Sequence, residues 1–289
     1  MKRSAPPILS ENPFVSVILT SYNYARFVGK AIDSVFAQTH RNCELIVVDD
    51  GSTDGSTEII REKLAGAPFP ARAFCQENRG QAAAMNTGFA SAQGEVVAFL
   101  DSDDHWNPTK LEEMLLFMRG HPDGGVYQHQ VEDGQGRPVL DPVCSGDYYQ
   151  KWLDVGELNT AIRHDLFLVF APTSGLLFRK GALDGVFPIP EQLIACPDTF
   201  LVFLACRFGP LYSNPRTLGV WRSHDSNAGK QDRFGYKNYG VSVVLGAVND
   251  RFRELGEPIR LSYRPLAVVW EPIRLVREAL TRRRKRRTG

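Results

Sequence analysis

Four short apolar runs, each followed at once by polar residues, constrain the fold of this chain more than any other feature of its sequence. The runs begin at residues 15, 43, 71 and 95 and read VSVILT, CELIVV, ARAFCQ and EVVAFL. Branched and aromatic residues in runs of this length are typical of buried strands. The regular spacing leaves room for one helix between consecutive strands, as in βαβ units. We therefore expect an α/β fold with a mainly parallel, doubly wound sheet and helices on both faces.

Helical patterns fill the gaps between these strands, at residues 25–38, 56–65 and 80–92. A further helix is expected to begin after Asn107, which suits an N-cap, with Pro108 in the first helical position. Residues 101–106 would then form a loop at the carboxyl end of a strand.

The regular spacing ends after about residue 122. Beyond it we expect strands within residues 121–139, 172–180 and 217–224, and helices at 198–208 and 234–255. No Pro- or Ser-rich linker divides the chain, so we expect one body with two functional halves, residues 13–122 and 123–256. Residues 257–289 would form a helical, basic extension.

That extension carries an unusual amount of charge. Residues 282–287, RRRKRR, contribute +6 to a formal net charge of +1, which leaves −5 for the rest of the chain. An acidic body argues against nucleic acid as a partner. A basic amphipathic segment can lie on an anionic membrane surface, and a solvated tail is the alternative. Scattered cysteines and the absence of a signal-peptide pattern predict a cytoplasmic protein, either free or held at the inner face of a membrane.

Three carboxylates follow the fourth apolar run in the sequence VVAFLDSDDHW. Asp101, Asp103 and Asp104 repel one another, and placing them at the end of a buried strand costs stability unless a cation lies among them. A solvated turn with helix-capping acids is the alternative. The other runs end in TSYNY (20–24), DDGSTDGS (49–56) and ENRG (77–80). In open α/β sheets ligands bind beyond the carboxyl ends of the strands, so these segments should meet at one edge.

These motifs, in this order and spacing, resemble the donor-binding half of family 2 glycosyltransferases, which have the GT-A (Rossmann-like) fold. The resemblance covers about residues 13–122. It is looser later, where it rests on PTSGLLFRK (172–180), PDTF (197–200) and WRSHDSN (221–227).

The resemblance implies a role for each matching residue. Asp103 and His224 would ligate a divalent metal, Mn²⁺ or Mg²⁺, and Asp198 would be the catalytic base. Asp104, Trp106 and Arg222 are further candidates, for support of the metal site, the wall of the sugar pocket and phosphate binding respectively. Trp106 could instead only pack the loop. The residues expected to contact the nucleotide-sugar donor are Thr20, Tyr22, Asn23, Asp50, Arg79, Asp101 and Ser102.

The implied reaction is inverting transfer of a sugar from a nucleotide-diphosphate sugar, with UDP favoured, to a hydroxyl of a saccharide or a lipid-linked acceptor. Two alternatives belong to other classes. One is a non-catalytic binding or assembly subunit. The other is a metal-dependent nucleotidyltransferase, for which the chain lacks a glycine-rich phosphate loop after a strand.

Overall fold

The structure is a computed structural model that describes residues 8–139, 171–222, 224 and 243–261. The described strands form one eight-stranded sheet in the order β3-β2-β1-β4-β7-β6-β8-β5. Their bounds are β1 Val15–Ser21, β2 Cys43–Asp49, β3 Ala71–Cys75, β4 Val96–Asp101, β5 His105–Trp106, β6 Val126–Glu132, β7 Leu176–Arg179 and β8 Leu211–Val220. The helices are α1 Ala25–Phe36, α2 Ser56–Ala65, α3 Gln81–Ser91, α4 Lys110–Gly120, α7 Pro197–Ala205 and α10 Leu245–Glu254, with 3₁₀ turns η2 Thr173–Gly175 and η3 Lys180–Leu183.

The four N-terminal strands of the sheet core are parallel, as expected. β1 pairs with β2 on one side and with β4 on the other, and β2 pairs with β3. The second half is mixed, because β7 runs antiparallel to both β4 and β6, whereas β6 and β8 are parallel. β4 therefore joins the parallel part of the sheet to the mixed part.

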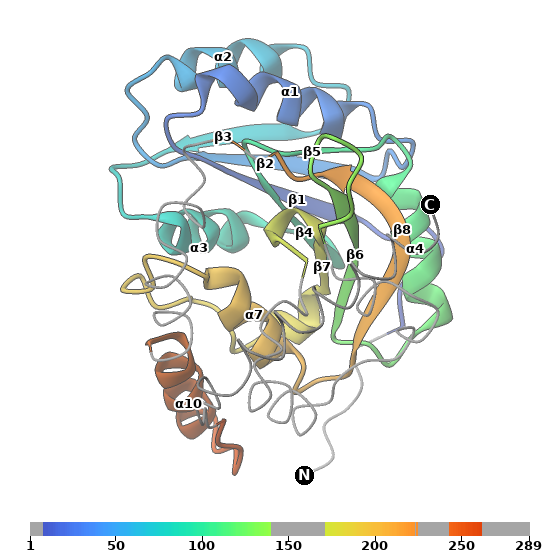
Figure 1. The fold of residues 1–289 in the computed structure, drawn as a ribbon, viewed down its shortest axis with the longest axis vertical. Coiled ribbons are helices and arrows are strands. Elements are labelled where there is room, and N and C mark those ends of the chain that lie inside the picture. The colour runs from blue at the N-terminus through green and yellow to red at the C-terminus, as the bar shows by residue number, and fades with distance from the viewer. Residues whose placement is uncertain (1–7, 140–170, 223, 225–242, 262–289) are drawn as a thin grey trace, which may run out of the picture.

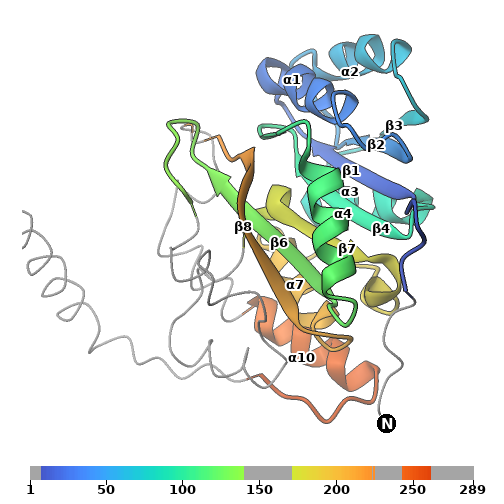
Figure 2. The same cartoon turned by 90° about the vertical axis from the view of Figure 1, so that its right-hand side faces the viewer.

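Helices cover both faces of the parallel strands. Alternate side chains of β1 point to opposite faces: Val17 and Leu19 pack in one core with α1 and α4, and Ile18 packs in another with α3 and α7. Figure 1 shows α1 and α2 on one face and α3 on the other. Figure 2 shows α4 alongside β6 and β8. This two-sided burial explains why β1, β2 and β4 are mostly apolar, whereas the edge strand β3 is partly exposed and contains Arg72.

Two of the expected boundaries were wrong. α4 begins at Lys110 and not at Pro108, because Asn107 is held in the sheet: its amide donates to the carbonyl of Leu218 and its side chain to that of Thr217. The segment 101–106 is also not wholly a loop, since His105 and Trp106 form β5 against β8. The pairing of β5 with β8 and the hydrogen bonds of Asn107 return the chain to the sheet directly after the three acids.

In the second half the expected elements are present with shifted limits. The expected strand at 172–180 begins with the turn η2 before β7, and β8 starts at Leu211, well before residue 217. The described part of the expected helix at 234–255 contains α10. Most of the extension expected at 257–289, including its basic cluster, lies outside the described residues. Among the helices described, none has the length and apolarity needed to span a membrane.

Candidate active site

The segments that follow β1, β2 and β4 lie side by side at the carboxyl edge of the parallel strands. Thr20 in β1 is the register partner of Asp101 in β4, and Ser21 is the partner of Asp49 in β2. The chain order reverses across β1, and open α/β sheets bind ligands at such a point. The expected gathering of these strand ends at one edge is confirmed.

The acids after β4 form a compact cluster. Asp101, Asp103 and Asp104 each place a carboxylate oxygen within 4.8 Å of the others. The side chain of Gln81, at the start of α3, donates from Nε2 to Asp101 Oδ1 at 2.7 Å. Asp103 is 8% exposed, whereas Asp104 is fully buried. Asp101 is half-buried and thus more exposed than either, so the cluster is open at Asp101, nearly closed at Asp103 and closed at Asp104.

Ser174, in the turn η2, holds two acids of this cluster in place through its hydroxyl. Its hydroxyl donates to Asp104 Oδ2 at 2.6 Å and accepts the backbone N–H of Asp101 at 3.1 Å. The second oxygen of Asp104 accepts the backbone N–H of Arg222 at 2.8 Å. Through its hydrogen bond with Arg222, Asp104 therefore connects the loop after β4 to the segment after β8.

Burial and mutual repulsion favour protonation of two of these acids. Burial, then Asp103 and Asp104, raises the pKa of Asp101 well above its ordinary value. Burial, then Asp103, raises the pKa of Asp104 to about 8. A divalent cation would relieve this repulsion, and carboxylate oxygens are the ligands that Mg²⁺ and Mn²⁺ prefer. The residues present therefore fit a hard divalent cation.

His224 completes this group from the segment after β8. Its Nε2 lies 2.9 Å from Asp103 Oδ2. The ring stacks on Phe27 at 5.0 Å between centroids and 24° between planes, and it meets Tyr24 edge-on at 5.5 Å. Burial, then Asp103, raises the pKa of Tyr24 to about 12, so the Tyr24 hydroxyl lies near the acids. The structure thus brings together the two predicted metal ligands, 121 residues apart in the chain.

Asp198 lies near Asp101 of the cluster, in the first turn of α7. Its carboxylate accepts the backbone N–H of Thr199 at 2.8 Å. The side chain of Thr173 lies beside the carboxylates of both Asp198 and Asp101 and partly offsets the rise in the pKa of each. Desolvation by burial raises the pKa of Asp198, and Asp198 in turn contributes to the raised pKa of Asp101. The predicted base is therefore a close neighbour of the acidic cluster, and its raised pKa makes it a better proton acceptor.

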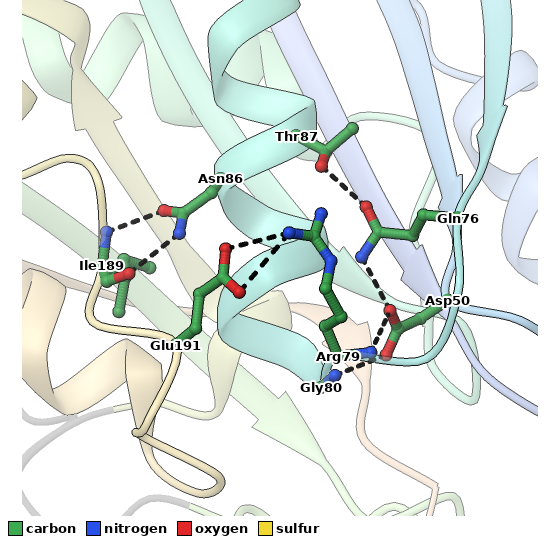
Figure 3. A network of polar contacts seen from close by, with 8 residues as sticks. All are labelled: Asp50, Gln76, Arg79, Gly80, Asn86, Thr87, Ile189 and Glu191. Atoms are coloured by element: carbon green, nitrogen blue, oxygen red, sulfur yellow. Dashed lines mark hydrogen bonds and ion pairs between the residues drawn. The ribbon is translucent and has the colours of Figure 1, made fainter.

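The end of β2 is connected to α3 and to the segment before α7 by the polar network in Figure 3. The Asp50 carboxylate accepts the backbone N–H groups of Arg79 and Gly80 at 3.0 and 2.7 Å, and the side chain of Gln76 at 2.7 Å. The Arg79 guanidinium lies 3.3 Å from Glu191. Asp50 thus fixes the backbone of the loop that presents Arg79.

A second contact in Figure 3 reinforces this connection. The Asn86 side chain donates to the Ile189 carbonyl at 2.8 Å and accepts the Ile189 N–H at 2.7 Å. Next to it, the rings of Phe89 and Phe187 stack with centroids 3.8 Å apart. Helix α3 therefore fixes the position of the segment that leads into α7 and Asp198.

The remaining donor candidates near β1 differ in exposure. Tyr22 is 45% exposed, whereas Thr20 is buried. Asn23 has a φ of 55°, a left-handed conformation that asparagine tolerates. Its N–H donates to Ser52 Oγ and its side-chain oxygen accepts the Thr53 N–H, both at 2.8 Å. Asn23 thus joins the end of β1 to the turn after β2.

Three further candidates have positions that narrow their roles. The Ser102 hydroxyl is buried and finds no hydrogen-bond partner among the described residues. Trp106 is 3% exposed and donates from Nε1 to the Ser174 carbonyl at 2.8 Å, so it packs the acidic loop, which was the second of its two expected roles. The Arg222 guanidinium lies 3.3 Å from His105 Nδ1.

Sequence reasoning did not assign roles to four residues that contact or adjoin the acids. Tyr24 and Gln81 lie within motifs that were recognised, and their spacing after the first and third strands was the available signal. Thr173 and Ser174 lie in the PTSG segment, whose resemblance was noted without a role. Gln81 and Ser174 hydrogen-bond to acids that lie far from them in the sequence, so the motif that contains each residue does not by itself reveal the contact.

Comparisons with known proteins agree with this geometry. The sequence model of the family described as Glycosyl transferase family 2 matches residues 16–187. An uncharacterized glycosyltransferase of Nostoc sp. (strain PCC 7120) is 37% identical over 255 residues, which cover 86% of this chain and 78% of the relative. Several further curated glycosyltransferases match over less than half of their own length.

Solved structures share the fold at low sequence identity. S. aureus TarS 1-349, in complex with UDP-GlcNAc, superimposes with a TM-score of 0.64 and 20% identity, over 85% of this chain and 68% of that chain. The mannosyltransferase PcManGT of Pyrobaculum calidifontis, in complex with GDP-Man and Mn²⁺, gives a TM-score of 0.58 and 19% identity, over 90% and 70%. The fold is that of GT-A glycosyltransferases, and with the match over residues 16–187 the chain belongs to glycosyltransferase family 2.

Proposed function

We propose that this glycosyltransferase moves a sugar from a UDP-sugar to a hydroxyl group of a saccharide or lipid-linked acceptor, with a divalent metal and with inversion at the sugar carbon. One observation carries the proposal: His224 contacts the acidic cluster at Asp103, and Asp198 lies near Asp101, with the Thr173 side chain beside both carboxylates. Sugar transfer needs the residues that would bind the metal and the donor diphosphate to lie close to the base that would accept the proton of the attacking hydroxyl.

The donor would bind along the carboxyl edge of β1, β2 and β4. Thr20, Tyr22 and Asn23 would contact the nucleoside from β1, and Asp50 and Arg79 from the next strand ends. Asp101 would contact the ribose or the metal, and Ser102 would contribute its backbone. The ligands of TarS, UDP-GlcNAc, and of PcManGT, GDP-Man, support a nucleotide sugar, and the sequence resemblance favours UDP.

Asp103 and His224 would hold the metal, Mn²⁺ or Mg²⁺, with Asp104 and Ser174 keeping Asp103 and its neighbours in place. When bound, such a cation stabilises the negative charge that develops on a departing diphosphate. The Mn²⁺ in the PcManGT complex supports this metal class. The protein's own part is to hold the carboxylates close together against their repulsion.

Asp198 would accept the proton of the acceptor hydroxyl as that oxygen attacks the sugar carbon. Its raised pKa suits a proton acceptor better than an ordinary carboxylate does. Thr173, which lies beside both Asp198 and Asp101, would help to orient it. Attack from the side opposite the nucleotide would give inversion in a single displacement.

The proposed location is the cytoplasm. The basic cluster 282–287, which lies outside the described residues, would contact an anionic membrane at its inner face and bring the site to a lipid-linked acceptor. Nucleic acid is not proposed as a partner.

The test is a calorimetric titration with UDP, GDP and dTDP, each with and without Mn²⁺. We expect binding of UDP that requires Mn²⁺ and that falls by at least about 100-fold in Asp103→Ala. Asp250→Ala, which removes an exposed carboxylate from α10, is the matched control and should bind UDP normally. Metal-independent binding of UDP, or no binding of any nucleotide, would contradict the proposal; the latter would favour the non-catalytic alternative.

A further inference from the structure

The segment between η3 and α7, residues 184–196, leads the chain to Asp198 and forms neither helix nor strand. Its backbone hydrogen bonds to other described backbone groups reach no further than four residues along the chain. Pro188 and Pro190 have no N–H to donate. Such a segment keeps one path only if side chains from other elements bind its remaining backbone groups.

Arg251, on α10, binds three carbonyl groups of this segment. Its Nη1 donates to the carbonyls of Gly185 and Val186 at 3.0 and 2.9 Å, and its Nη2 donates to the carbonyl of Pro188 at 2.9 Å. The Arg251 side chain is only 16% exposed. A guanidinium presents its donors in one rigid plane, so these three hydrogen bonds fix the path of the backbone over residues 185–188.

The same guanidinium also lies against α7. Its central carbon is 5.8 Å from the ring centroid of Phe200, which is fully buried and follows Asp198 closely in the first turn of the helix. Val248 and Phe252, on the buried face of α10, belong to the same core as Phe200, and α10 lies next to α7 (Figure 2). Arg251 therefore contacts both the segment that leads into α7 and the helix itself.

The entry into α7 is strained. Cys196, the residue before the helix, has a φ of 55° and a ψ of 40°, a left-handed conformation that is unfavourable for a residue with a Cβ. Such a conformation persists only where the surrounding structure holds the chain in place. If Cys196 relaxed, the first turn of α7 would shift, and Asp198 would shift with it.

We propose that Arg251 is a positioning residue for Asp198. It holds the 185–188 backbone and the Phe200 ring in a fixed relation, and this keeps the strained entry and the first turn of α7 in place. The inference rests on the proposed function, in which Asp198 is the base, and it adds a residue from a helix outside every motif of the active site. A displacement of about 1 Å at a reacting group can lower a rate by about 100-fold.

The first experiment needs no ligand. Amide hydrogen exchange is measured by mass spectrometry on the full chain, in peptides covering α7, with peptides covering β1 as the reference for global opening. Arg251→Gln is expected to speed exchange in α7 relative to β1 by about fivefold, the effect of losing roughly one net hydrogen bond. Arg253→Gln removes a guanidinium on the same helix that is 78% exposed and paired with Asp250, and should change neither peptide.

The same exchange measurement has two further variants. Glu254→Gln removes the ion pair that Arg251 Nε forms at 3.0 Å but keeps the three carbonyl contacts, so exchange in α7 should stay unchanged. Arg251→Lys keeps the charge and the aliphatic stem, cannot span three carbonyls, and should give an intermediate increase. Exchange in α7 that is unchanged in Arg251→Gln, or that rises only in parallel with β1, would overturn the role of Arg251.

The second experiment measures the rate of UDP release from UDP-GlcNAc with Mn²⁺, divided by the number of UDP-binding sites found by calorimetry. Arg251→Gln is expected to lower this rate per site by about 10- to 100-fold, while the dissociation constant for UDP changes less than about twofold. Arg253→Gln should alter neither. A variant that only unfolds would lose UDP-binding sites and keep its rate per site, and that result would overturn the proposal.

Failure of the proposed function gives a different pattern. If the unmodified protein neither binds UDP nor releases it from UDP-GlcNAc, the donor is wrong, and the exchange measurement alone decides whether Arg251 holds α7. If Asp198→Asn keeps the full rate while Arg251→Gln still speeds exchange in α7, the base is wrongly assigned and the contact between α10 and α7 stands.

Discussion

Asp198 is the residue at which the proposed chemistry is most sharply testable. Asp198→Asn keeps the size of the side chain and an oxygen that can accept the Thr199 N–H, but it removes the proton acceptor. The transfer rate is therefore expected to fall by roughly 100- to 10,000-fold, while the dissociation constant for UDP with Mn²⁺ changes less than about twofold. Steady-state kinetics and calorimetry on the same preparation check this. A parallel loss of binding would indicate a structural role.

Lys110 is a buried cation that no hydrogen bond satisfies. Its Nζ lies 3.3 Å from the Trp106 ring centroid and has no hydrogen-bond partner among the described residues. Burial lowers its pKa well below the ordinary value. Lys110→Met is expected to raise the free energy of unfolding at pH 7 by about 1–3 kcal/mol, because a buried charge or unpaired amine is replaced by an apolar side chain.

The pH dependence of the stability gained in Lys110→Met follows from the lowered pKa of Lys110. The unfolded lysine binds a proton that the folded one holds less tightly, so the contribution of Lys110 to the free energy of unfolding becomes less unfavourable as pH rises to about 10.5. The advantage of Lys110→Met should therefore shrink between pH 6 and pH 10 in urea titrations. An advantage that grows with pH, or a less stable variant, would contradict the assignment.

The residues recognised from sequence are those whose chemistry is evident in a short motif. Asp103 and His224 were paired as ligands and lie 2.9 Å apart. Thr173 and Ser174 were not recognised, because a hydroxyl has no distinctive signal until the acids it contacts are known. The same holds for Glu191, whose contact with Arg79 depends on the path of a loop 112 residues away.

Among the elements, η2 supports the site through Ser174, whose hydroxyl hydrogen-bonds to two of the acids. Ser174→Ala removes the hydroxyl that joins Asp101 to Asp104 and is expected to weaken Mn²⁺ binding by about 10- to 100-fold. Ser16→Ala is the control: its hydroxyl is also buried and multiply bonded, to Glu44 and Gly94, but at the opposite end of β1. It should reduce stability without changing Mn²⁺ affinity. Equal Mn²⁺ affinities in the two variants would contradict the role given to Ser174.

The elements of the parallel half could be predicted because β1, β2 and β4 are buried on both faces and each helix is amphipathic or has small side chains. α4 was placed too early because the capping preference of Asn107 was outweighed by its hydrogen bonds to β8. β5 was missed because its two residues carry no pattern of their own. They form a strand only where β8 passes beside them.

At the scale of the whole molecule, the acidic cluster couples stability to metal. The raised pKa values of Asp101 and Asp104, the latter about 8, mean that these two carboxyl groups bind more protons in the folded protein than in the unfolded chain above pH 4. These groups therefore lower stability as pH rises towards 8. A bound cation replaces those protons and removes the effect.

The difference in melting temperature between Mn²⁺-loaded and EDTA-treated protein should accordingly increase from pH 5 to pH 8. Taking the difference cancels the contributions of His129 and Lys110 to stability. Their lowered pKa values make stability rise with pH, but they do so equally in both samples. In Asp104→Asn the metal-free protein should lose less stability over this range. A constant difference in the unmodified protein would contradict the coupling.

The two halves of the molecule differed in how far sequence could predict them. The first consists of repeated βαβ units whose local signals agree with their tertiary environment. The fold class, the order of the elements along the chain and most of their boundaries could therefore be predicted. The second is irregular, and its strand order depends on β7 inserting antiparallel between β4 and β6. That pairing joins residues about 80 positions apart, for which no short-range signal exists.

The position of β4 between β1 and β7 has a consequence for protein engineering. β4 carries the acids at its end, pairs with the parallel strands on one side and receives the second half on the other. A chimaera that takes its first 139 residues from this chain and its remainder from a relative would need to preserve the pairing of β4 and β6 with β7 and the pairing of β5 and β6 with β8. A relative that keeps these ladders could then supply a different acceptor side to the proposed donor-binding half.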